Sequence, residues 1–120
     1  MTAITLADTD GSPDTAAVTG WLPLVNTPCH PEYPAGHPSL NGAAATVLLS
    51  HFADGQTFTL TTTGRQNRTY TSISQARADG NNARVWGAMH YPSTVMASDA
   101  VGEAIANYVN LHAMSRRRGR

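Results

Sequence analysis

The stretch that decides the fold is His30-Pro31-Glu32-Tyr33-Pro34-Ala35-Gly36-His37-Pro38-Ser39, in which a proline-rich run leads into a helix. Pro38 suits the first helical position, which makes His37 the expected N-cap residue. Free N–H groups at a helix N-terminus bind anions, and Gly36 lets the backbone come close to a ligand. His37 could then donate to an oxyanion or carry a proton. The alternative is that His37 only caps its helix, and spacing alone leaves both open.

Three helices are predicted along the rest of the chain. The first has one largely apolar face, formed by Leu40, Ala44, Val47, Leu48 and His51. The second is expected near residues 72–90, because a serine at its start and a glutamine three residues later have capping-box spacing. The third is expected near residues 94–114. Between the first two, residues 58–63 are β-prone and suit a short strand or an extended connection.

The residue pattern also predicts which helix faces pack. The second helix carries a stripe of small residues that lets another backbone approach closely, namely Ala76, Gly80, Ala83 and Gly87. The third helix carries one face formed by Val101, Ile105, Tyr108 and His112. We expect the aromatic rings of Tyr108 and Trp86 to pack in the core.

These elements predict an all-α class: the C-terminal part of a helical bundle, with about three main helices and a long irregular N-terminal leader. The 120 residues divide into an extended proline-rich leader (1–36), a helical domain (37–115) and a basic tail (116–120). No apolar run is long enough to span a membrane, and no signal peptide is visible, so the chain is expected to be soluble. The lone Cys29 excludes an internal disulfide.

The charges are distributed unevenly. Half of the eight arginines lie in the tail, and without it residues 1–115 carry four arginines against eight acidic residues, a net charge of −4. No aromatic residues are interleaved with the tail arginines, so we expect a solvated chain end and no nucleic-acid binding.

Arg84 and His90 form the second candidate pair. Six residues turn an ideal helix by about 600°, which leaves the two side chains about 120° apart. They can share a ligand only if the arginine reaches along the axis and His90 lies at the helix end; the alternative is an exposed arginine and a packed histidine. Together with His37 and the helix N-terminus, the pair suits a tetrahedral oxyanion such as phosphate or vanadate. The sequence has no His-x-x-x-His pair, clustered carboxylates or nucleophile elbow.

Two segments resemble the motifs of a known family. Residues 30–37, followed by Asn41-Gly42-Ala43-Ala44-Ala45-Thr46-Val47-Leu48, resemble the central motif of the vanadium-dependent haloperoxidases, which share their site with the type 2 phosphatidic acid phosphatases. Residues 83–91, followed by residues 102–103, are similar to the C-terminal motif of that family, with the same arginine–histidine interval. The likeness covers nearly the whole chain, including residues 7–11 of the leader.

The resemblance implies a role for each candidate residue. His90 would be bonded to vanadium, or would take phosphate as a nucleophile. Arg84 and the Gly36 N–H would hold oxygens of the anion, and His37 would be the acid–base group. His30 resembles a histidine that lies behind the site in bromide-using members.

The chain also departs from the family pattern. Ala35 stands where the central motif has a serine, and Pro92 and Thr94 stand where an arginine and a histidine-orienting aspartate usually follow His90. The first motif of the family contains a lysine and an Arg-Pro pair, and this sequence has neither. We therefore expect that the sequence starts past the first motif.

The resemblance implies a vanadate-dependent haloperoxidase-like protein, which oxidises halide with peroxide once the missing motif completes the site. One alternative is an acid phosphatase on the same oxyanion site, and another is an inactive truncated homologue that acts only through assembly. The expected ligands are the small oxyanion, peroxide and halide. Because part of a bundle leaves apolar helix faces exposed, we also expect an oligomer or a partner chain that covers them.

Overall fold

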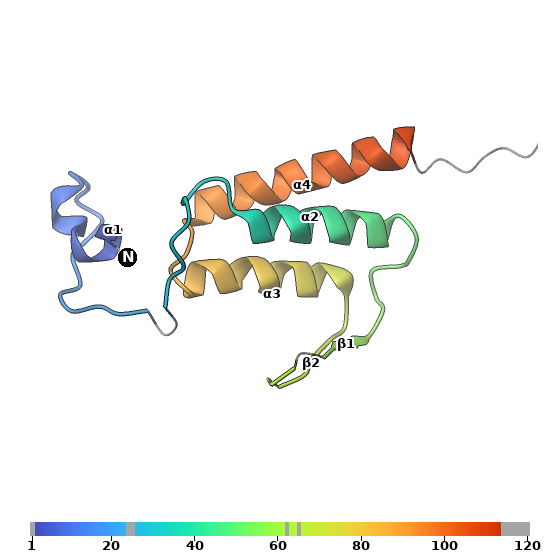
Figure 1. The fold of residues 1–120 in the computed structure, drawn as a ribbon, viewed down its shortest axis with the longest axis horizontal. Coiled ribbons are helices and arrows are strands. Elements are labelled where there is room, and N and C mark those ends of the chain that lie inside the picture. Colours follow the sequence, from blue (N-terminus) through green and yellow to red (C-terminus); the bar gives the residue numbers. More distant parts are fainter. Residues whose placement is uncertain (1, 24–25, 62, 65, 114–120) are drawn as a thin grey trace, which may run out of the picture.

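Three long helices dominate the structure, a computed structural model that describes residues 2–23, 26–61, 63–64 and 66–113 (Figure 1). They are α2 (Gly36–Leu49), α3 (Ile73–Trp86) and α4 (Pro92–His112). Figure 1 shows α2 lying between α3 and α4. The predicted all-α class with three main helices is confirmed. The basic tail lies outside the described residues.

The remaining elements are short. Within its described residues, the leader is irregular except for two helical turns that the sequence did not predict, α1 (Thr2–Thr5) and η1 (Ala7–Thr9). Strands β1 (Phe58–Leu60) and β2 (Arg68–Tyr70) pair antiparallel. Residues 58–63 were expected to form a short strand or an extended connection, and β1 lies there; β2 was not predicted, because three residues are too few to show alternation. No helix in the described part of the chain is long and apolar enough to cross a membrane.

The ends of the helices differ from prediction, and α4 begins at Pro92, two residues before the expected start. Helix α2 begins at Gly36 with Ala35 as N-cap, so Pro38 lies in the first turn and His37 is not the cap. Proline is tolerated there because the first-turn N–H groups have no partner within the helix. Helix α3 begins as predicted, with the Ser72 hydroxyl accepting the Gln75 N–H at 2.9 Å, but it ends at Trp86, earlier than expected.

Helices α2 and α4 pack backbone against backbone. A Cβ atom placed on Gly102 would lie 1.9 Å from the Ser39 carbonyl oxygen, and one placed on Gly42 would lie 2.2 Å from the Asp99 carbonyl oxygen. The buried residues of α4 are correspondingly small or short, and they are Thr94, Val95, Ser98, Gly102 and Ala106. Glycine at both positions is thus a requirement of this interface.

The predicted apolar face of α4 was wrong. Val101, Ile105 and Tyr108 are about half exposed or more, and Trp86 of α3 is 67% exposed. On α2, Leu40 is exposed as well. The physical reason is that helices this close have no room for large side chains between them, so the small residues face inward.

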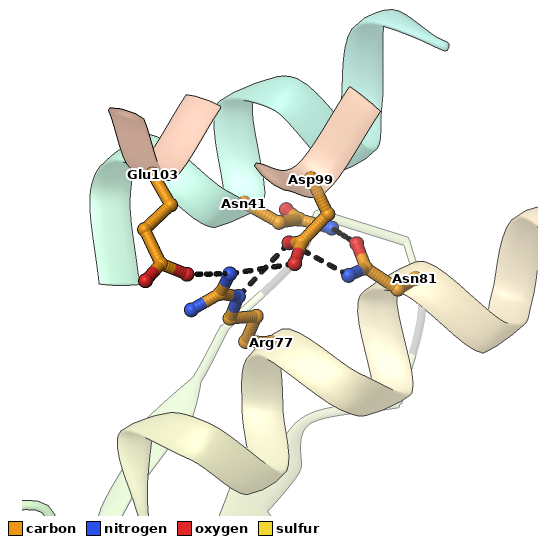
Figure 2. A network of polar contacts seen from close by, with 5 residues as sticks. All are labelled: Asn41, Arg77, Asn81, Asp99 and Glu103. Carbon is orange, nitrogen blue, oxygen red and sulfur yellow. Dashed lines mark hydrogen bonds and ion pairs between the residues drawn. The ribbon is translucent and has the colours of Figure 1, made fainter. Parts of the chain in front are cut away.

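A polar network joins the three helices (Figure 2). The Arg77 guanidinium of α3 donates to both Asp99 carboxylate oxygens of α4, at 2.9 and 2.6 Å, and to Glu103 at 2.6 Å. Asn81 donates to Asp99 at 2.8 Å and accepts from Asn41 of α2 at 3.0 Å. These bonds fix the position of α3 relative to the α2–α4 pair.

The network shifts the pKa of its ionisable groups. Burial alone raises the pKa of the Asp99 carboxyl, but hydrogen bonds from Arg77 and Asn81 and the charge of Arg77 outweigh it, so the net pKa lies below its usual value. The hydrogen bond to Asp99 contributes most to raising the pKa of Arg77, against the effect of burial. Each group thus stabilises the charged form of the other.

Replacing Asp99 by alanine is expected to lower the free energy of unfolding by about 2–3 kcal/mol, because Arg77 and Asn81 lose their shared acceptor in a partly buried site. Urea denaturation followed by circular dichroism measures this loss. The folded-state pKa of Asp99 is depressed, so its contribution is present above the unfolded pKa of about 3.9 and is lost as the pH falls further.

The variant Asp99→Asn is the matched control for charge, because it keeps the shape of the side chain. The free energy of unfolding of Asp99→Asn should fall less steeply than that of the unaltered chain as the pH drops below about 4. Equal slopes for the two chains would contradict the assigned role of Asp99.

Candidate functional site

The start of α2 is anchored by Ala35 and open at Gly36. Ala35 is completely buried, and its N–H donates to the Ser98 hydroxyl of α4 at 2.9 Å. Its carbonyl oxygen accepts a hydrogen bond from the Ser39 hydroxyl at 3.2 Å. A Cβ atom on Gly36 would meet nothing within 4 Å. Gly36 is exposed beside a firmly held residue, so the backbone at this helix N-terminus is accessible, as anion binding requires.

His37 lies within electrostatic range of the other candidate residues. Burial lowers the pKa of the His37 imidazole most, and the positive charges of Arg84, His30 and His90 lower it further. The structure therefore brings the four side chains predicted from two separate segments into one neighbourhood. Their chemical roles stay predictions.

Arg84 lies in the last turn of α3, and its Nε atom has no hydrogen-bond partner among the described residues. Its Nε atom is buried without a hydrogen bond, and burial lowers the pKa of its guanidinium. No ion pair of Arg84 is found among the residues that the structure describes. Because a desolvated cation without a counter-charge is unfavourable, this position is suited to an incoming anion.

A tight turn brings His90 back toward the start of α2. Ala88 has a φ of 52°, and the Met89 N–H donates to the Arg84 carbonyl oxygen at 3.0 Å. Left-handed φ values are uncommon for residues other than glycine, and they cluster at functional sites. The turn ends α3 and directs the chain into α4, so His90 lies in the link between the two helices.

The His90 ring is buried and fixed. It is 6% exposed, and its Nδ1 atom lies 2.6 Å from the Glu32 carbonyl oxygen. A carbonyl oxygen only accepts hydrogen bonds, so Nδ1 carries the proton and Nε2 presents the lone pair. His30 stacks on the ring with a centroid distance of 5.1 Å and an interplanar angle of 20°. Nε2 is thus the atom of His90 that can bond a ligand.

Glu32 is the residue that sequence reasoning missed. Its carboxylate accepts the Tyr91 N–H at 2.8 Å and the Thr94 hydroxyl at 2.9 Å, and its carbonyl orients His90. The only available signal was its place inside the segment 30–37. His90 is therefore oriented without an acidic residue at position 94.

A cavity of about 390 Å³ lies beside His90. Its walls are mostly apolar, and Glu32 and His90 are its polar members; the remaining lining residues are Ala3, Ile4, Val85, Ala88, Met89, Tyr91 and Pro92. A cavity of this size admits a small molecule close to the imidazole.

Residues 4–119 match a family model described as the VCPO second helical-bundle domain. The chain belongs to the vanadium haloperoxidase superfamily. The crystal structure of the first bacterial vanadium-dependent iodoperoxidase is similar to it, with a TM-score of 0.69 and 32% sequence identity. The match covers 74% of this chain and 22% of that one, so the haloperoxidase-like chain spans less than a quarter of the relative. No curated protein matches it.

The residues of this haloperoxidase-superfamily chain fit an oxyanion. The unpartnered Nε of Arg84, the open N-terminus of α2 at Gly36 and the Nε2 lone pair of His90 are complementary to a small anion with several oxygens. Among the described residues, no group of three or more His, Cys, Asp or Glu side chains could hold a metal ion.

Proposed function

We propose that the chain supplies the oxyanion site of a vanadate-dependent haloperoxidase. The observation that carries the proposal is the convergence of two segments, in which the Glu32 carbonyl accepts from His90 and His37 lies in the field of Arg84. The two pairs join residues that are 58 and 47 positions apart in the sequence. A fold that only buried its histidines would not require a cationic side chain at the same place.

Each side chain has a distinct task in this mechanism. His90 would bond the vanadate through Nε2, Arg84 would neutralise its oxygens, and the Gly36 N–H would donate to it. Bound vanadate supplies a Lewis acid that activates peroxide toward attack by halide. Burial and the nearby cationic groups lower the pKa of His37, which favours its neutral form, so it would accept a proton from the incoming peroxide.

Calorimetric titration with orthovanadate and with inorganic phosphate tests the site directly. We expect both anions to bind at the same place and to compete, and the vanadate-loaded chain, completed by a segment that carries the missing first motif, to oxidise iodide or bromide when hydrogen peroxide is added. Hydrolysis of a chromogenic phosphate ester that vanadate inhibits would instead support the phosphatase alternative. Absence of binding by either anion would contradict both.

We also propose that a second copy of the chain covers α4. The exposed side of this helix carries five large apolar residues, which are Met96, Val101, Ile105, Tyr108 and Leu111. Exposed apolar patches of this kind mark association surfaces. Assembly without catalysis is the function that this face supports by itself.

Sedimentation of the chain is expected to show a species larger than the monomer, and Ile105→Glu should weaken self-association by about tenfold or more, because it places a charge in the apolar contact. Leu22→Glu is the matched control, since Leu22 is also a large apolar residue that is exposed, but it lies in the leader. A monomer at every concentration would contradict the proposal.

A further inference from the structure

We propose that Glu32 positions His90. Glu32 holds the His90 imidazole in its Nδ1–H form and keeps Nε2 directed to the ligand. The geometry itself is independent of the proposed function, and only the consequence for oxyanion binding rests on it. Glu32 lies in the loop before α2 and makes three hydrogen bonds to the segment that begins α4.

The backbone carbonyl of Glu32 sets the tautomer. It accepts the Nδ1 proton of His90 at 2.6 Å, and it has no proton to offer in return. The hydrogen bond at one ring nitrogen determines which form the other nitrogen adopts. A neutral His90 with the proton on Nε2 would place a donor where a ligand bond is needed and leave the buried carbonyl without its donor.

The carboxylate of Glu32 keeps this carbonyl in place. Its two oxygens accept from different groups at the start of α4, the Tyr91 N–H and the Thr94 hydroxyl. Thr94 is 7% exposed, so this contact is largely shielded from water. A negative charge at a helix N-terminus is also favourable, because it satisfies a free N–H group and complements the helix dipole. With both oxygens engaged, the residue has little freedom to rotate its peptide group away from His90.

The stacking of His30 completes the restraint. The His30 ring packs on His90, and the His30 Nδ1–H donates to the Pro31 carbonyl at 2.9 Å. The loop that contains Glu32 thus supplies both a face-on contact and an in-plane hydrogen bond. Without the carboxylate, the Glu32 carbonyl is no longer held against His90 Nδ1, whereas His30 still stacks on the His90 ring. The ring should therefore stay near its place, while its proton becomes distributed between Nδ1 and Nε2.

The test compares Glu32→Ala, Glu32→Gln and Thr94→Val with the unaltered chain. The readout is the ¹⁵N chemical shifts of the His90 ring at about pH 9, where histidine is neutral. We expect a single Nδ1–H pattern in the unaltered chain and an averaged pattern in Glu32→Ala. The affinity for inorganic phosphate should fall by about tenfold in Glu32→Ala and less in Glu32→Gln.

The variants separate positioning from a merely structural role. If Glu32→Ala fails to fold, Thr94→Val removes only the hydroxyl donor and should still shift the His90 pattern partway. A folded Glu32→Ala with an unchanged His90 pattern would overturn the proposal. If the pattern shifts but the unaltered chain binds neither phosphate nor orthovanadate, the positioning role stands and the proposed function fails.

Discussion

Replacing Gly102 by alanine is expected to unfold the bundle or to lower its free energy of unfolding by about 4 kcal/mol or more. The added Cβ would lie 1.9 Å from the Ser39 carbonyl oxygen, 2.8 Å from its carbon and 3.0 Å from the Ala43 nitrogen. All three atoms belong to the backbone of α2, so no side-chain rotation relieves the overlap. The helices must separate, which also displaces the nearby start of α2 that carries Gly36 and His37.

Gly55→Ala is the matched control for this substitution. Gly55 has no atom within 4 Å of the position that a Cβ would take. Thermal unfolding of the two variants should therefore differ widely, with the Gly55 variant close to the unaltered chain. If Gly102→Ala unfolds cooperatively at the same midpoint temperature as the unaltered chain, the close contact of α2 and α4 is contradicted.

The helices were predictable because their signals are local. The capping pair Ser72 and Gln75 forms the expected hydrogen bond, and proline lies in the first turn of both α2 and α4. Which face packs is not local information. Hydrophobic periodicity identified Val101 and Ile105 as an apolar face, yet Ser98, Gly102 and Ala106 lie inward because the partner backbone comes close. A stripe of small residues signals such an approach. The sequence analysis predicted one on α3 but did not recognise the one on α4.

The site was predictable in its residue types but not in its geometry. Spacing left two alternatives open for each residue: His37 as a cap or an oxyanion donor, and Arg84 and His90 as unrelated side chains or partners of a shared oxyanion. The resemblance to a family favoured the shared ligand. The structure adds the unpartnered Nε of Arg84 and the hydrogen bond from His90 to Glu32. That bond joins positions 58 residues apart, and no short-range pattern encodes a contact across such a distance.

Replacing His90 by alanine is expected to weaken vanadate and phosphate binding by about 100-fold or more. The variant loses the Nε2 atom that would bond the anion. Loss of a single charge-assisted hydrogen bond already costs about 1.5–3 kcal/mol, or roughly 10- to 100-fold in affinity, and a bond to the anion should contribute at least as much. Calorimetry with orthovanadate measures the loss, and halide oxidation should disappear with it.

His51→Ala is the control for removing a histidine, because His51 is exposed just beyond the end of α2 and lies outside the neighbourhood of His30, His37, Arg84 and His90. It should bind both anions as the unaltered chain does. Because His90 is buried against His30, circular dichroism must show that the His90 variant keeps its helices. A folded His90→Ala chain with undiminished vanadate affinity would mean that the anion is held elsewhere, and that the convergence of the two segments serves only to close the bundle.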